Sequence, residues 1–141
     1  MTKFFAKLDQ NNIVIDTCSF SDNFTESDVQ LFYNDGHTYK QYKIDDPTFR
    51  QRPAAITGTY LPDVDVFTEI NPFPSWILNP DRNYIYVAPV AEPSFDVTTH
   101  TIQWDEPNLR WLRDEVDDNG LLKDPRVQSY WDPNNNIWNN L

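Results

Sequence analysis

Prolines interrupt this chain so often that they limit what it can fold into. Eleven prolines occur among 141 residues, whereas three residues are glycine. Proline removes a backbone donor and breaks helices, so we expect helices to be few and short. With so little glycine, asparagine and aspartate must form the tight turns, because they tolerate the left-handed backbone conformation. The sequence therefore predicts a mainly β protein built from short strands.

One short pattern recurs and predicts antiparallel β-hairpins. A strand rich in aromatic or aliphatic residues is followed by Asp or Asn, then by three or four turn residues, then by a second such strand. The Asp or Asn side chain can accept a backbone N–H two residues further on. Rings that face each other across the strands contribute about 0.2–1 kcal/mol per pair. The pattern occurs at residues 8–13, 55–68, 76–87, 101–111 and 130–138.

The N-terminal third combines strands with a short helix. An apolar run, a polar turn and a β-branched run predict a hairpin formed by residues 3–8 and 12–18. Thr25 or Ser27 can cap a short helix near residues 26–34, and Asn, Asp and Gly end it. This is the one helix that we expect.

Two further segments have weaker patterns. Residues 38–44 alternate and favour a strand. Residues 105–116 fit two structures. Asp105 can cap a helix that places Leu109 and Leu112 on one face, whereas the recurring hairpin pattern favours two strands there. We expect the hairpin.

Two proline-rich segments, 71–75 and 88–93, separate the hairpins and should be extended and semi-rigid. We therefore expect a small N-terminal unit of strands and one short helix over residues 1–55. Residues 56–141 should form an elongated chain of aromatic-flanked hairpins joined by proline-rich linkers.

The charge balance is strongly acidic. The chain has 22 acidic and 11 basic residues, which gives a net charge of −11. Such a field repels phosphate, so we expect no nucleic-acid partner and no binding to an anionic membrane surface. A single cysteine, Cys18, permits no disulfide within the chain. The absence of a secretory signal and of a long apolar run favours synthesis in a cytoplasm.

The residues that usually carry chemistry are few and scattered. Three glycines form no phosphate-binding loop, and no nucleophile motif occurs. His37, His100 and Cys18 lie at no metal-ligand spacing. The acidic run near Gly120 resembles a calcium loop, but Arg126 stands where the closing acid is required. We expect no enzymatic activity, no cofactor and no metal site.

The aromatic share is 15%, so rings must supply much of the buried surface. Each tryptophan lies beside a turn, where it can pack within a hairpin, stack on a carbohydrate or anchor a protein interface. Buried tryptophan carries a large share of interface energy. The candidate interface anchors are Trp76, Trp104, Trp111, Trp131 and Trp138.

Two stretches, residues 1–16 and 71–111, resemble small virion structural proteins of tailed phages that infect marine cyanobacteria. The sequence departs from that pattern at residues 22–55 and from residue 112 onward. The resemblance implies a virion structural or assembly protein and brings no catalytic residues. The segments that carry it are KFFAKLD at 3–9, NNIV at 11–14, PFPSWILN at 72–79, YVAPVAEP at 86–93, QWDE at 103–106 and Trp111.

We therefore expect a virion component that decorates the capsid or belongs to the neck, tail or fibre. Its hairpins and extended arms would bind other virion proteins in a symmetric assembly of many copies. A soluble chaperone for tail or fibre assembly is the first alternative. A carbohydrate-binding module for host contact is the second.

Overall fold

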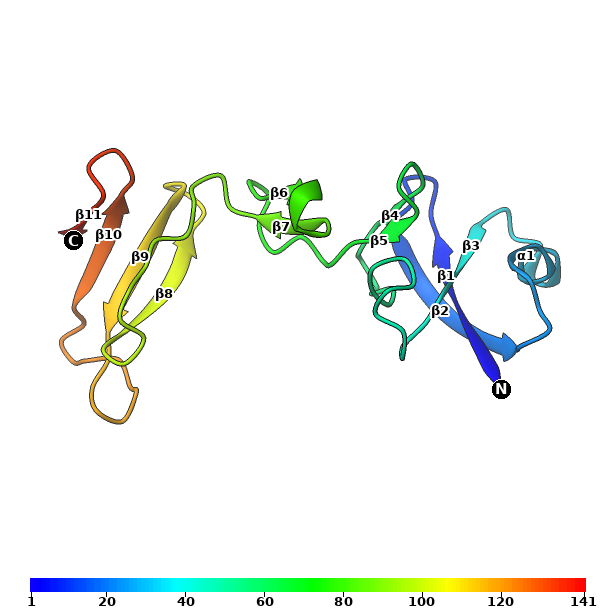
Figure 1. The fold of residues 1–141 in the computed structure, drawn as a ribbon, viewed down its shortest axis with the longest axis horizontal. Helices are drawn as coiled ribbons and strands as arrows, with labels where there is room; N and C mark the ends of the chain where they lie inside the picture. Colours follow the sequence, from blue (N-terminus) through cyan, green and yellow to red (C-terminus); the bar gives the residue numbers. More distant parts are fainter. The chain divides into compact units, whose positions relative to one another are not determined.

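The computed structural model describes residues 1–141 and is mainly β, with 39% of residues in strands and 8% in helical structure, which comprises one α-helix and a short 3₁₀ helix. This confirms the predicted fold class. The chain divides into two compact units. Unit 1 comprises Met1–Pro72 and Leu78–Tyr86, and unit 2 comprises Phe73–Ile77 and Val87–Leu141. The boundary expected between residues 55 and 56 therefore lies inside unit 1. Figure 1 shows the elements along the chain.

Unit 1 is organised around an antiparallel sheet with the strand order β2-β1-β3. Its strands are β1 (Thr2–Leu8), β2 (Val14–Ser21) and β3 (Thr38–Tyr42). The turn between β1 and β2 forms because the Asp9 carboxylate accepts the N–H groups of Asn11 and Ile13, while Asn12 has a φ of 62°. The predicted N-terminal hairpin and the strand that follows the helix are thus confirmed.

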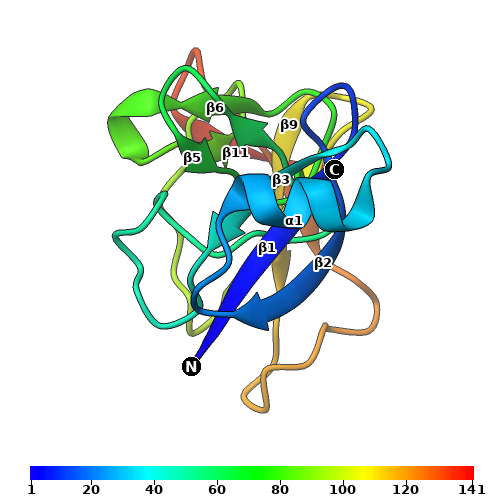
Figure 2. The same cartoon turned by 90° about the vertical axis from the view of Figure 1, so that its right-hand side faces the viewer.

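Helix α1 (Glu26–Tyr33) begins where the sequence predicts it. Thr25 and Asp28 form a reciprocal capping box, and Asn34 ends the helix in the left-handed conformation. Val29 is fully buried and packs with Phe5 and Tyr39 of the sheet. Figure 2 shows α1 lying across this sheet.

The other face of the same sheet is covered by a short hairpin, β4 (Tyr60–Leu61) and β5 (Val66–Phe67). Tyr60 and Phe67 pack there with Leu8 and Val14 in a second core cluster. The guanidinium of Arg52 donates to the carbonyl oxygens of Phe67 at 2.8 Å, Tyr84 at 3.2 Å and Asn83 at 2.6 Å. Arg52 thereby ties β5 to the turn before β7.

The third hairpin consists of β6 (Ile77–Asn79), a 3₁₀ turn η1 (Pro80–Arg82) and β7 (Ile85–Val87). The Asn79 side chain accepts the N–H of Asp81, and Asn83 and Tyr84 both have positive φ. A polar side chain at the strand end again starts the turn, as the recurring pattern predicts.

Unit 2 is built on one four-stranded antiparallel sheet, in which Figure 1 shows the strands side by side. Its strands are β8 (His100–Asp105), β9 (Arg110–Glu115), β10 (Gln128–Asp132) and β11 (Ile137–Asn140), in the order β11-β10-β9-β8. Residues 105–116 form a turn and a strand, so the helical alternative is wrong. The two hairpins join edge to edge through β9 and β10 instead of forming separate ribbons.

The proline-rich segments do not form simple extended spacers. The backbone N–H of Trp76 donates to the Phe73 carbonyl at 3.0 Å, which closes a turn within the first segment. The second segment lacks regular structure, and its Val90 carbonyl accepts the indole N–H of Trp111 at 2.8 Å. The first segment is therefore turned rather than fully extended, and the Trp76 side chain and the Val90 carbonyl join the two segments to the tryptophans of unit 2.

Candidate functional site

The register of the unit 2 sheet places four tryptophans on one face. Trp104 pairs with Trp111, and Trp131 pairs with Trp138. Paired residues of antiparallel strands point to the same side, and so do residues two apart in a strand. Arg113, two residues after Trp111, pairs with Ile102 on one side and Ser129 on the other. The tryptophan face therefore comprises His100, Ile102, Trp104, Trp111, Arg113, Glu115, Ser129, Trp131, Trp138 and Asn140.

The two hairpins that form this face share the same turn sequence pattern. Each reads Trp-Asp, then five further residues, then Trp: WDEPNLRW and WDPNNNIW. The carboxylates of Asp105 and Asp132 accept donors within their turns, and the residue before each returning strand is left-handed, with φ of 50° at Leu109 and 54° at Asn136. The rings then meet across the strands, with centroids 5.1 Å apart in the first pair and 5.3 Å apart in the second.

The half of the face on β8 and β9 is covered by the chain itself. Trp76 packs against both indoles, with centroids 6.2 Å from Trp104 and 5.9 Å from Trp111. Only 7% of Trp104 and 6% of Trp111 remains exposed. Three of the five candidate anchors thus lie in an internal cluster.

Glu106 completes this covered half. Its carboxylate accepts the indole N–H of Trp104 at 2.7 Å, and the N–H and hydroxyl of Ser75 at 2.9 and 2.7 Å. Desolvation alone would raise the pKa of Glu106, but the hydrogen bonds from Ser75 and Trp104 outweigh it and hold the pKa below its usual value. The carboxylate is therefore charged at neutral pH and fixes the segment that covers the rings.

The half of the face on β10 and β11 is open. Trp131 and Trp138 are each half-buried, and neither indole N–H has a hydrogen-bond partner within the chain. The guanidinium of Arg113 lies over the Trp138 ring, 4.7 Å from its centroid. No carboxylate forms an ion pair with Arg113, and its Nε is buried without a partner. The open half thus presents two rings and a cation whose hydrogen-bonding groups are not used.

Sequence reasoning named the tryptophans but missed Arg113. The available signal was strand alternation, because Arg113 lies two residues beyond Trp111 and must share its face. The arginine was missed because the pairing of β9 with β10, which brings it beside the second tryptophan pair, spans a long loop.

The other residues that we weighed for chemistry form no catalytic or metal-binding group, although the register places His100 at the end of this face, opposite Glu115. His37 contacts the Leu8 carbonyl through Nδ1 at 3.0 Å, and His100 contacts the Thr99 hydroxyl at 2.8 Å. The Asp117 carboxylate accepts backbone N–H groups of its own turn. No three His, Cys, Asp or Glu residues form a group able to hold a metal ion.

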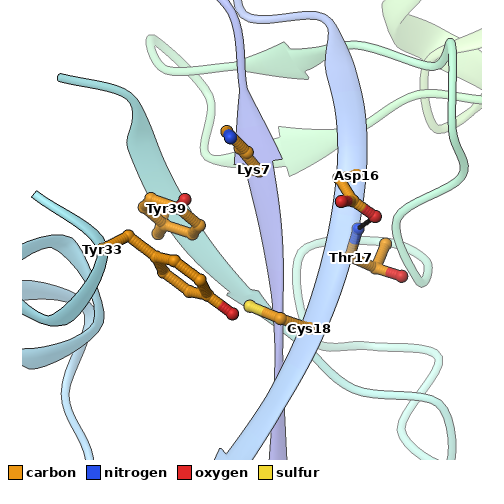
Figure 3. A pocket seen from close by; sticks show the side chains of 6 residues that line it. All are labelled: Lys7, Asp16, Thr17, Cys18, Tyr33 and Tyr39. Carbon is orange, nitrogen blue, oxygen red and sulfur yellow. Dashed lines mark hydrogen bonds between the residues drawn. The ribbon is translucent and has the colours of Figure 1, made fainter. Parts of the chain in front are cut away.

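Cys18 lines a pocket of about 60 Å³ in unit 1, together with Lys7, Asp16, Thr17, Tyr33 and Tyr39. Figure 3 shows the Tyr33 hydroxyl and the Cys18 thiol pointing toward one another. Burial raises the pKa of the Cys18 thiol, so the thiolate is disfavoured at neutral pH. The geometry is that of a half-buried side chain rather than an activated nucleophile.

No family model, no curated protein and no solved structure matches this chain. None of its helices has the length and apolar character needed to cross a bilayer.

Proposed function

We propose that this chain is a non-enzymatic structural protein of a phage virion, and that it binds other virion proteins through the open half of its tryptophan face. The observation that carries the proposal is the set of Trp131, Trp138 and Arg113, which is only half-buried and has unused hydrogen-bond donors. Tryptophan and arginine dominate the binding energy of protein interfaces. Indole rings also supply a large contact area at low entropic cost.

The covered half indicates what a partner must bring to the open half. There, the chain itself supplies one aromatic ring, Trp76, and two acceptors, the Glu106 carboxylate and the Val90 carbonyl, for the indole N–H groups of Trp104 and Trp111. We infer that a partner segment places an apolar or aromatic side chain between the rings of the open half. It would also provide acceptors for the two indoles and for the arginine.

The assignment to a virion comes from the resemblance of residues 1–16 and 71–111 to cyanophage structural proteins. In such a particle the chain would be synthesised in the host cytoplasm and present in many copies. One shallow site per copy is then sufficient, because repeated contacts on a lattice add avidity. The net charge of −11 supports protein partners over nucleic acid.

A carbohydrate platform is less well supported by the geometry. The rings of Trp131 and Trp138 are inclined by 58° to each other, and the guanidinium of Arg113 occupies one face of Trp138. Sugar rings stack best on an unobstructed aromatic plane. We therefore do not propose glycan binding at this face.

The test is a peptide inventory of purified particles from a phage that encodes this chain. We expect the wild-type chain in mature particles and at least tenfold less of a Trp131→Ala, Trp138→Ala double variant, since both hot-spot rings are lost. Tyr130→Ala is the matched control, because Tyr130 precedes Trp131 in β10 and points to the opposite face. A wild-type chain that is present in lysates but missing from particles would reject the proposal in favour of an assembly chaperone.

A further inference from the structure

Strand β11 forms an edge of the unit 2 sheet, and its outward backbone groups can be identified. The Leu141 N–H donates to the Gln128 carbonyl at 3.0 Å, in register with the β10–β11 ladder. Hydrogen-bonded pairs alternate along antiparallel strands. Residues 137, 139 and 141 therefore direct their N–H and C=O groups toward β10. Trp138 and Asn140 direct theirs away from it, to the open edge.

At two other sheet edges of the molecule, some of the outward N–H groups are occupied, which is one way in which natural proteins protect their edges. At the edge of β3, the Gln41 N–H donates to the Glu26 carboxylate at 2.6 Å, and the Tyr39 N–H donates to the Gln30 side chain at 3.2 Å. At the β8 edge, the His100 N–H donates to a carbonyl of the preceding turn at 2.9 Å. Strand β11 has no such cover, no proline and no charged side chain.

The exposed side chains of this strand match a second copy of themselves in one register. In an antiparallel pairing centred on Asn139, Trp138 and Asn140 form hydrogen-bonded pairs with Asn140 and Trp138 of the second copy. Ile137 then lies opposite Leu141 of the second copy, and these side chains are 49% and 61% exposed in the single chain. A register centred on Trp138 would instead place Ile137 opposite an asparagine. The apolar match therefore selects the first register.

We propose that β11 pairs with β11 of a second copy, which joins two four-stranded sheets into one eight-stranded sheet with a two-fold axis at Asn139. The pairing adds four backbone hydrogen bonds and buries Ile137 and Leu141 against each other. Because paired residues point to the same side, both tryptophan faces lie on one side of the joined sheet. This proposal does not depend on the virion assignment, and it creates two neighbouring binding sites if that assignment holds.

The test is sedimentation equilibrium of the full chain over concentrations up to about 500 µM, because self-association follows mass action. We expect a monomer–dimer equilibrium for the wild type. Asn140→Pro removes an outward N–H without touching the bonds to β10, so it should weaken dimerisation at least tenfold. Asn140→Ala keeps the N–H and is the matched control. Added salt should strengthen the dimer, since each copy carries a charge of −11.

A second measurement shows whether Asn140→Pro removes only the dimer contact or also unfolds the sheet. The Trp131 and Trp138 rings lie 5.3 Å apart across the strands and should give an exciton couplet in circular dichroism, which is separated from the signal of Trp104 and Trp111 by subtracting the spectrum of the same chain carrying Trp131→Phe. The Asn140→Pro variant should keep this couplet. A wild-type chain that stays monomeric throughout, or a dimer that Asn140→Pro leaves intact, would overturn the proposal. Unchanged dimerisation in Ile137→Ser would overturn the register.

Discussion

Substituting an exposed residue usually costs less stability than substituting a buried one. For the ion pair between Asp114 and Arg126 we predict the reverse. Asp114 lies in β9 with 2% of its side chain exposed, whereas the side chain of Arg126 is 50% exposed. The guanidinium binds both carboxylate oxygens, at 2.5 and 2.9 Å, and Gln128 adds a longer bond of 3.3 Å. We predict that Arg126→Ala destabilises unit 2 more than Asp114→Asn does.

The expected loss of stability in each variant depends on which charge is left without a partner. Asp114→Asn removes a charge-assisted pair but leaves Arg126 in contact with water, so it should cost about 2 kcal/mol, in the range of hydrogen bonds to charged groups. Arg126→Ala leaves a buried carboxylate that keeps one long bond. Stranding a buried charge costs more than losing the pair itself, so this variant should be the less stable of the two.

The contribution of Asp114 to stability depends on pH with opposite signs in the wild type and in Arg126→Ala. In the wild type the hydrogen bond from Arg126 holds the pKa of Asp114 below its usual value, against the effect of burial. The ion pair therefore stabilises the fold above the unfolded-state pKa of about 4 and loses its effect as the pH falls through the lower folded-state pKa. In Arg126→Ala burial dominates and raises the pKa of Asp114. Protonation of Asp114 then removes the unpaired buried charge. The difference between the variant and the wild type in free energy of unfolding should therefore shrink between pH 7 and about pH 4.

Urea unfolding followed by tryptophan fluorescence measures this directly, because all five tryptophans belong to unit 2. Titrations at several pH values give the free energy of unfolding of that unit alone. An Arg126→Ala variant at least as stable as Asp114→Asn at pH 7 would refute the reasoning. So would a deficit that stays constant as the pH falls.

Three further predictions concern other local features. Arg52→Met removes donors from three carbonyl oxygens and should destabilise unit 1 by about 2 kcal/mol in amide exchange, while the tryptophan fluorescence transition of unit 2 stays unchanged. Asn136→Leu forces a bulky residue to a φ of 54° and should lower the stability of unit 2 by about 1 kcal/mol in urea titrations. Thr25→Ala removes the cap of α1 and should cost about 1 kcal/mol, seen as faster amide exchange in the helix; unchanged protection would contradict the capping argument.

The hairpins were predictable because their turns are local. The Asp9, Asn79 and Asp132 side chains each accept a backbone N–H two residues further on, so the information lies within a few positions. The helix was predictable for the same reason, since its capping box spans four residues. Leu109, like Tyr84, is an exception. It adopts the left-handed conformation usually left to Asn or Gly, and its place in the repeated pattern, not its residue type, indicates the turn.

The joining of the two C-terminal hairpins was not predictable in this way. The acidic run that begins at Asp114 looks solvent-exposed in the sequence, yet Asp114 is buried because its partner Arg126 lies twelve residues further along. The course of the proline-rich segments was not predictable for a similar reason. Proline sets the local backbone, but contacts of Trp76 and Val90 with distant tryptophans decide where each segment lies.

The same ion pair supports the strand pairing that creates the candidate site. The loop between β9 and β10 closes through the bonds of Arg126 and Gln128 to Asp114, and this closure holds β10 beside β9. Without that pairing Arg113 would not lie over Trp138, and the second tryptophan pair would sit on an isolated hairpin, which is marginally stable in water. A buried polar contact on the opposite side of the sheet thus helps to hold the tryptophan face together. It follows that Arg126→Ala should weaken partner binding although Arg126 is no part of the face, whereas Thr25→Ala, in unit 1, should leave it unchanged.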